Sequence, residues 1–394
     1  MMMNRRRKGK ISPVEDEIFS ENGIYYKKLA DKYHIAGIVV LVLAAVFLFA
    51  MLFTGHRALR RDNFRYLVKY LGVGPLSLDT RYSDVVYAAG GGVKFTMYRG
   101  DLAVIGDGRT VLYNLAGTAL FRENEPSGTT AYAVGGYLAV YVPGGETLSL
   151  YNSYSRVHTA SFENPIGLVT VAENGAFAVY GKKNAVSVVS VFDSDFREVY
   201  TWESEELVYD LALSADGKTL AVLTLSSAGG AYSSTLTVKN TRADSIVTEE
   251  RFDGKKPVAV RFFSDGRFMA AVDGTLNFYR AGGARAQTVS LSAGVSKYET
   301  NENHIAVLLS ASEAVIYTSR GTEGARIALP GNALDVCLSG DLAAFLSENA
   351  VFLYRTDGAL ITTFSAESGV LDFFILDDGS VLLCYASVTE RLVP

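Results

Sequence analysis

Short apolar segments, most with a central alanine, recur along the chain at intervals of about forty residues. Each follows an earlier apolar segment, and in several repeats an Asx–Gly turn such as Asp216-Gly217 separates the two. Apolar runs joined by Asx–Gly predict a β-hairpin, because glycine adopts the positive φ that the turn requires. The eight copies are Leu102–Val104, Leu138–Val140, Phe177–Val179, Leu220–Val222, Met269–Ala271, Ile305–Val307, Leu342–Ala344 and Val381–Leu383.

Two further strands complete the repeat. The third ends on an aromatic residue such as Tyr113 or Tyr354, and a fourth, more polar segment follows a second turn. A unit of four short strands with a period near forty is typical of a β-propeller blade. We therefore predict an all-β fold, an eight-bladed β-propeller of four-stranded blades over residues 82–394, with seven blades as the alternative.

The ends of the repeat region predict how the ring closes. The last repeat stops after a third strand at residues 389–393 and so lacks a fourth. An apolar segment, residues 84–88, precedes the first strand of the first blade. Pairing this segment with the last blade would complete that blade and remove the open sheet edges.

A continuous apolar segment precedes the repeats. Residues 35–53 read IAGIVVLVLAAVFLFAMLF and contain no charge. At 1.5 Å per residue such a helix spans roughly 28 Å, about one hydrocarbon core. We predict a single transmembrane helix; a cleavable signal peptide is the alternative, but a leader of 34 residues would be unusually long for one.

The segments on either side of this helix are basic. Residues 1–34 form a tail with eight Lys and Arg, which favours a cytoplasmic N-terminus and an extracytoplasmic propeller. Residues 54–81 form a basic amphipathic linker that either lies on anionic headgroups or serves as a stalk. Because this linker is also basic, the reverse orientation stays open. Its five basic residues are Arg57, Arg60, Arg61, Arg65 and Lys69.

Charge and cysteine content limit the partners and cofactors. Residues 71–394 hold 24 Lys and Arg against 36 Asp and Glu, and this acidic balance disfavours nucleic-acid binding. Cys337 and Cys384 lie on adjacent repeats and form neither a disulfide framework nor a zinc-binding pattern. None of the four histidines has a histidine partner at metal-ligand spacing. We predict no metal and no cofactor.

Charged loops at one end of the ring are a candidate partner surface. In a propeller, the loops that join one blade to the next share a rim with the turns between second and third strands. Ordinary solvated loop charge is the alternative explanation. The residues on this rim are Glu123, Glu125, Glu163, Glu205, Glu206, Arg109, Lys182 and Lys183.

Three carboxylates fall in the first strands of their blades, which line the central channel: Asp210, Asp335 and Asp372. If they converge, they could serve a hydrolase or lyase acting on glycans or lactones. The alternative is a structural role, in which each accepts a hydrogen bond. No Gly-x-Ser-x-Gly nucleophile motif is present, so the sequence favours a non-enzymatic function over catalysis.

The segment SADGKTLAV, residues 214–222, resembles the repeats of WD-repeat-like and quinoprotein-like propellers. The whole layout is similar to membrane-anchored propeller proteins of unknown function in Clostridia-type Gram-positive bacteria. The Trp-Asp ends of true WD repeats are missing, and Trp202 is the sole tryptophan. The resemblance implies a β-propeller fold and a membrane anchor. We expect a membrane-tethered extracytoplasmic module that binds a cell-envelope protein or glycan, with a cytoplasm-facing signalling platform as the alternative.

Overall fold

The structure is a computed structural model, and the chain divides into two units, Met1–Arg65 and Tyr66–Pro394. It describes residues 29, 32–46, 84–87, 92–152, 155–228, 230–291, 295–330 and 332–394.

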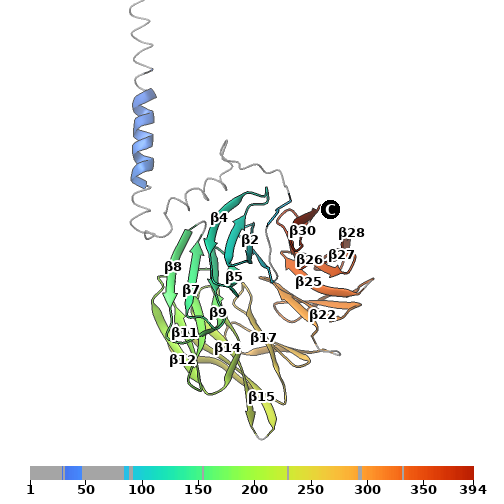
Figure 1. Cartoon of the computed structure of the whole chain (residues 1–394). Helices are drawn as coiled ribbons and strands as arrows, with labels where there is room; N and C mark the ends of the chain where they lie inside the picture. The colour runs from blue at the N-terminus through green and yellow to red at the C-terminus, as the bar shows by residue number, and fades with distance from the viewer. Residues whose placement is uncertain are drawn as a thin grey trace, which may run out of the picture. The chain divides into compact units, whose positions relative to one another are not determined.

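The described part of the second unit consists of antiparallel β-sheets (Figure 1). The strands of the first four sheets are β1 (Lys94–Tyr98), β2 (Asp101–Gly106), β3 (Arg109–Tyr113), β4 (Ala119–Asn124), β5 (Thr130–Val134), β6 (Tyr137–Tyr141), β7 (Thr147–Asn152), β8 (Ser155–Ser161), β9 (Ile166–Val171), β10 (Phe177–Lys183), β11 (Val186–Phe192), β12 (Glu198–Ser204), β13 (Leu207–Leu213), β14 (Thr219–Ala228), β15 (Ala231–Asn240) and β16 (Ser245–Asp253). The strands of the last four are β17 (Pro257–Phe262), β18 (Phe268–Val272), β19 (Thr275–Tyr279), β20 (Arg285–Ser290), β21 (Lys297–Thr300), β22 (His304–Ser310), β23 (Glu313–Thr318), β24 (Glu323–Ala328), β25 (Ala333–Ser339), β26 (Leu342–Ser347), β27 (Ala350–Arg355), β28 (Leu360–Ser365), β29 (Asp372–Ile375), β30 (Val381–Cys384) and β31 (Thr389–Leu392).

These strands form eight blades among the described residues. Seven sheets contain four consecutive strands each, and the eighth contains β29, β30 and β31. The eight-bladed prediction is confirmed, and the seven-bladed alternative is wrong. Each predicted apolar copy lies in the second strand of its blade, as the pairing of Leu220–Val222 in β14 with β13 illustrates.

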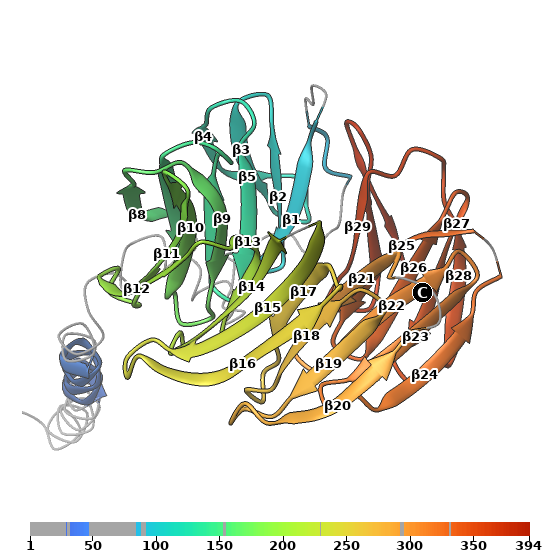
Figure 2. The same cartoon turned by 90° about the horizontal axis from the view of Figure 1, so that it is seen from below.

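The chain start completes the last blade as predicted. Val86 pairs antiparallel with Val388, next to β31. The Val85 amide donates to Thr389 Oγ1 at 3.0 Å, and the Thr389 amide donates to the Val85 carbonyl at 3.1 Å. The first and last blades therefore lie side by side, as both views show (Figure 1, Figure 2).

The core is divided among the blade interfaces. The described residues form eight buried apolar clusters, and each cluster joins two neighbouring blades, including the eighth to the first. Seven of the repeated segments place a fully buried alanine at their centre, which lets adjacent sheets approach closely. These alanines are Ala103, Ala139, Ala178, Ala221, Ala270, Ala306 and Ala343.

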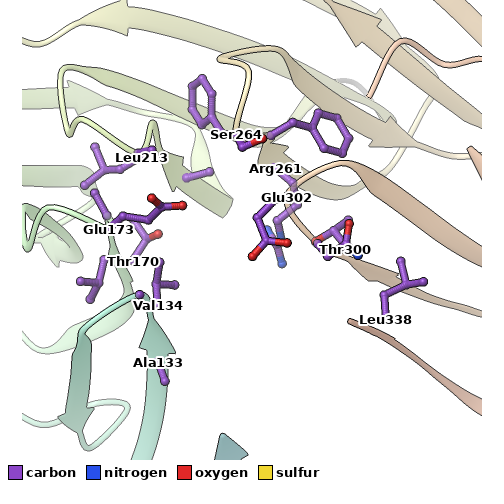
Figure 3. Close-up of a pocket in the computed structure, with 18 of the residues that line it drawn as sticks. Ala133, Val134, Thr170, Glu173, Leu213, Arg261, Ser264, Thr300, Glu302 and Leu338 are labelled. Carbon is purple, nitrogen blue, oxygen red and sulfur yellow. The ribbon is translucent and has the colours of Figure 1, made fainter. Parts of the chain in front are cut away.

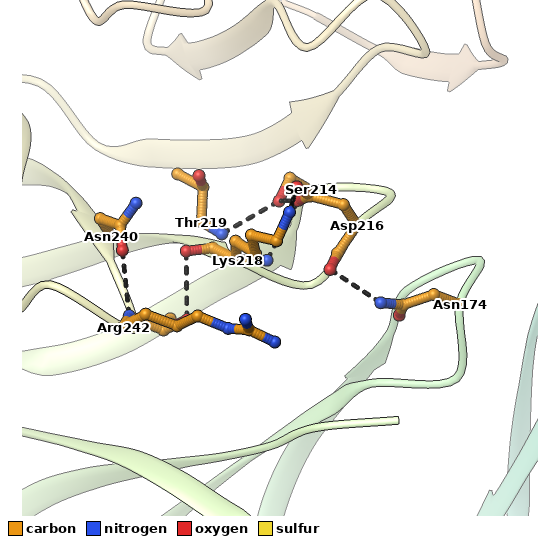
Figure 4. Close-up of polar contacts among 8 residues, drawn as sticks. Asn174, Ser214, Asp216, Lys218, Thr219, Asn240 and Arg242 are labelled. Atoms are coloured by element: carbon orange, nitrogen blue, oxygen red, sulfur yellow. Dashed lines mark hydrogen bonds and ion pairs between the residues drawn. The ribbon is translucent and has the colours of Figure 1, made fainter. Parts of the chain in front are cut away.

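The turn between β13 and β14 shows why the repeat needs its polar residues (Figure 4). The Ser214 hydroxyl donates to Asp216 Oδ1 at 2.8 Å and accepts from the Thr219 amide at 3.0 Å. Gly217 has a φ of +69°, which side chains with a Cβ rarely adopt. The turn also links blades, because Asn174 Nδ2 donates to the Asp216 carbonyl at 2.7 Å.

Residues 32–46 of the first unit form a helix. The tail at 1–28, the rest of the predicted transmembrane segment at 47–53, and the linker at 54–81 lie outside the described residues. Within the described part of the chain, no helix has both the length and the apolar character needed to cross a membrane. Each of the eight Ile, Val and Leu side chains between residues 35 and 46 is more than half exposed.

Candidate functional site

The ring has two ends, which differ in the connections that they carry. We call the end with the blade-to-blade loops the loop rim. There, the Glu125 amide donates to the Gly108 carbonyl at 2.7 Å and the Phe162 amide to the Glu146 carbonyl at 2.8 Å. These bonds join each blade-to-blade loop to the turn between second and third strands of the same blade, so both kinds of connection share this rim.

Three of the charged residues predicted for the loop rim have partners within the fold. Glu123 Oε2 lies 2.9 Å from Arg156 Nη2, and the Tyr151 hydroxyl donates to Glu125 Oε1 at 3.1 Å. Burial raises the pKa of Glu125, against the hydrogen bond from Tyr151 and the charge of Arg156. Glu206 accepts from the hydroxyls of two threonines in its own blade.

The other five are exposed on the loop rim: Arg109, Glu163, Lys182, Lys183 and Glu205. They carry both signs of charge and come from blades 1 to 4. The loop rim therefore presents charged side chains of both signs. The binding of a partner there stays a prediction. Arg109 also lines a small hollow of about 180 Å³.

The opposite end, which we call the turn rim, carries the turns between first and second strands. It opens into a central cavity of about 1040 Å³. Figure 3 shows that Arg261, Glu173 and Glu302 extend into this space from different blades. A second cavity of about 400 Å³, lined by residues of β25 and β29, shares Met97 and Glu299 with the first, so the two form one channel.

Asp210, the first predicted channel carboxylate, is held in an ion pair. Its Oδ2 lies 2.5 Å from Arg261 Nη1 and accepts from the Val260 amide at 2.9 Å. Its Oδ1 accepts from the amide of Leu211 at 3.0 Å. These bonds satisfy both carboxylate oxygens and connect blade 4 to blade 5.

Asp335 and Asp372 line the 400 Å³ cavity together with Glu299, a carboxylate that the sequence analysis missed. Asp335 accepts from Lys297 Nζ at 3.2 Å. Burial, then repulsion from Asp335, raises the pKa of Asp372 to about 6, against the hydrogen bond from the Phe373 amide. Burial raises the pKa of Glu299 to about 7; Arg261 opposes this shift, while both aspartates add to it.

The structure thus places two of the three predicted carboxylates, Asp335 and Asp372, at one cavity. The third, Asp210, forms a salt bridge with Arg261. All three share a local contact: one carboxylate oxygen accepts from the next amide, at 2.9–3.0 Å. That recurrence is the structural role considered as the alternative to catalysis. The sequence analysis missed Arg261 as well as Glu299. The one feature of the sequence that could have identified them is that both are charged residues within first strands.

Cys337 also lines the 400 Å³ cavity. Cys337 and Cys384 are free thiols, and burial raises the pKa of Cys337 to about 12. Across the described ranges, no three His, Cys, Asp or Glu side chains are placed to hold a metal ion.

Comparison with solved structures supports the fold. Similar chains include the computationally designed Ika8 protein (TM-score 0.55, 10% identity, 77% of this chain and 96% of that one). BamB from Moraxella catarrhalis has a TM-score of 0.53 at 13% identity, covering 80% of this chain and 97% of its own. The C-terminal WD40 domain of Sif2 has a TM-score of 0.55 at 14% identity, covering 75% and 92%. At such low identity the likeness shows the fold alone.

No curated protein matches the chain. A family model does match it, over residues 82–392, which is the predicted propeller region almost from end to end. The described family is one of unknown function, so it assigns neither ligand nor reaction. On this match, the chain belongs to the family of unknown function DUF5711.

Proposed function

We propose that this protein is a membrane-tethered, extracytoplasmic binding module that presents its propeller to a protein or glycan of the cell envelope. The observation that carries the proposal is the closed ring of eight blades, with a buried apolar cluster at each interface. Such a ring holds its loops on a fixed scaffold, and binding residues are often found on loops placed in this way.

The first unit supports the tether. The Ile, Val and Leu side chains of residues 35–46 are exposed, and a run of this kind is stable when lipid or protein covers it. The apolar sequence continues to residue 53, which gives a length that matches the hydrocarbon core. The arginine-rich tail favours a cytoplasmic N-terminus. The resemblance to anchored propeller proteins of Clostridia-type Gram-positive bacteria points the same way.

Protease accessibility tests the orientation. The full chain, with one epitope tag at each end, is expressed in a Gram-positive host, and intact protoplasts are treated with protease. We expect loss of the C-terminal tag and protection of the N-terminal tag, with both tags lost after lysis. Protection of the C-terminal tag would refute the extracytoplasmic placement and favour a cytoplasm-facing signalling platform.

Cell fractionation tests the tether itself. Arginine at Leu41, inside the apolar run, opposes insertion by about 2.5–3.5 kcal/mol. Leu41→Arg together with Leu43→Arg should therefore move the protein out of the membrane fraction. Leu360→Arg is the control, because Leu360 is also an exposed leucine and lies outside the apolar run, on outer strand β28. Retention of the double variant in the membrane contradicts the tether.

Photo-crosslinking in the same cells tests partner binding. A photoreactive residue at Lys183, on the loop rim, should form adducts with an envelope protein or glycan. The same residue at Leu360, on the outside of blade 7, gives the background. Equal labelling from both positions would refute a partner site on the loop rim.

The alternative function, a hydrolase or lyase, has one specific observation in its favour. Asp335, Asp372 and Glu299 meet at one cavity, and two of them have raised pKa values. Alanine replacement of Asp210, Asp335 and Asp372 separates the two functions. An enzyme would lose turnover of a glycan or lactone and stay folded, whereas structural carboxylates would cost stability.

A further inference from the structure

The central channel is large enough to hold a ligand. The cavity of about 1040 Å³ at the turn rim lies at the upper end of the range for ligand pockets, roughly 300–1,000 Å³. Its walls come from the first strands of blades 1 to 7, and the adjoining 400 Å³ cavity adds β29 of blade 8. The first strands of all eight blades therefore contribute to the available space.

Aromatic side chains line this channel. Tyr132 lines the larger cavity and is 39% exposed, although it lies on β5, a first strand inside the ring. Tyr298 lines the same cavity from β21. Tyr209 on β13 is 48% exposed and lies near Tyr298, outside the lining of both cavities. Tyr298 packs against the apolar cluster between blades 5 and 6, and Arg261 Cζ lies 5.9 Å from the centre of its ring, so Tyr132 is the ring that the fold leaves open to the cavity.

A β-bulge places Tyr209 in this position. The register of β13 against β14 shifts between Val208 and Asp210, so Tyr209 is the extra residue. Bulges of this kind change the direction of a side chain and are common next to binding sites.

The polar groups beside the tyrosines are fixed in place. Arg261 donates to Asp210 at 2.5 Å, to the Val260 carbonyl at 2.7 Å and to the Tyr298 hydroxyl at 3.3 Å. A guanidinium held by three acceptors loses little conformational freedom when a ligand arrives. Its remaining N–H groups and the neighbouring carboxylates provide both donors and acceptors.

The charges of the channel limit the chemistry of its ligand. Arg261 is neutralised by Asp210, and Glu173, Glu299 and Glu302 line the same cavity, so an anionic ligand is repelled. The exposed ring of Tyr132 suits a molecule with a flat apolar C–H surface, while the fixed polar groups suit hydroxyls. A pyranose ring has both features.

We propose that the channel binds an uncharged oligosaccharide, with a sugar ring stacked on Tyr132 and hydroxyls bonded to Arg261 and Glu299. The site is entered from the turn rim (Figure 3). The inference deepens the proposed envelope-binding role by naming a ligand class, and it depends on neither the tether nor the orientation.

Calorimetric titration of the full chain tests the proposal, in a detergent without sugar headgroups. The probes are chitotetraose and cellotetraose, whose equatorial substituents leave both ring faces flat. We expect saturable binding of at least one, weakened about tenfold in Tyr132→Ala, the ratio that corresponds to about 1.4 kcal/mol. Tyr232→Ala is the matched control, because Tyr232 is 37% exposed on the β14–β15 hairpin outside the channel.

Trilysine, titrated in parallel, tests the rival ligand, a basic peptide attracted by the carboxylates. Binding of trilysine without either saccharide, lost in Glu299→Gln, would overturn the proposal. So would the absence of saccharide binding, or saccharide binding that Tyr132→Ala leaves unchanged. If the loop rim binds a partner, crosslinks from Lys183 should still form even where no saccharide binds the channel. A failure of the saccharide proposal can therefore be told apart from a failure of the proposed partner site.

Discussion

Replacing Thr389 by valine tests the closure of the ring. The hydroxyl of Thr389 accepts the amide proton of Val85 at 3.0 Å, and both residues are at least 99% buried. Valine has the same shape but no acceptor, so the Val85 amide would be left buried without a partner. Such a loss costs about 1–3 kcal/mol. We expect a lower urea midpoint for unfolding, with an unchanged denaturant slope.

Thr110→Val is the matched control for this experiment. Thr110 is also fully buried, but its hydroxyl has no hydrogen-bond partner among the described residues. The same substitution there removes an unsatisfied polar group and should be neutral or stabilise the fold by about 1–3 kcal/mol. Thr389→Val should therefore lower the urea midpoint of unfolding, whereas Thr110→Val should not.

Hydrogen exchange locates the effect of Thr389→Val. If residues 84–87 close the ring, their amides should exchange faster in this variant, while those of a central blade stay protected. Equal midpoints for Thr389→Val and the unmodified chain would refute the reasoning. A loss in Thr110→Val as large as that in Thr389→Val would refute it as well.

Two further predictions concern a turn and the channel. Gly217→Ala adds a Cβ that would lie 2.4 Å from the Cβ of Ala176, at a φ of +69°. Gly254 has nearly the same φ, +68°, but has no atom within 4 Å of an added Cβ. Gly217→Ala should therefore lower the unfolding temperature further than Gly254→Ala. Glu299 has its pKa raised to about 7 from 4.5 by burial, so the folded state binds more protons than the unfolded state between these pH values. Stability should therefore fall as pH rises through this window, and Glu299→Gln should flatten that dependence in urea titrations at pH 5 and pH 7.5.

The fold could be predicted because its signals are local. An Asx–Gly turn between two apolar runs, present in several repeats, specifies a hairpin within about ten residues, and the eight recurring apolar segments specify the ring. The closure of the ring could also be predicted, although it joins distant residues, because residues 84–88 are an apolar segment without a partner in their own blade. The transmembrane helix at residues 35–53 stays a prediction from a run of apolar residues, of which 47–53 lie outside the described part of the chain.

The site could be predicted only in part, because its contacts join blades that are distant in sequence. The ion pair of Asp210 with Arg261 links residues 51 positions apart, and no pattern within one repeat reports it. The bulge that exposes Tyr209 depends on the register of β13 against β14. On the loop rim, Glu206 looks like a free charge in the sequence, whereas in the structure two threonine hydroxyls bind it.

Both rims carry bonds between neighbouring blades, and the two rims present different residues to a ligand or partner. On the turn rim, hydrogen bonds run from blade to blade, as from Asn174 to the Asp216 carbonyl and from Asn301 to the Gly340 carbonyl. The mouth of the channel is thereby fixed by its neighbours. On the loop rim, some bonds stay within one blade, as from the Glu125 amide to the Gly108 carbonyl, and others cross to the next blade, as in the Glu123–Arg156 ion pair. None of the eight charged residues of the loop rim lines either channel cavity. A ligand in the channel and a partner on the loop rim would therefore contact separate residues, and one ring can carry both without competition.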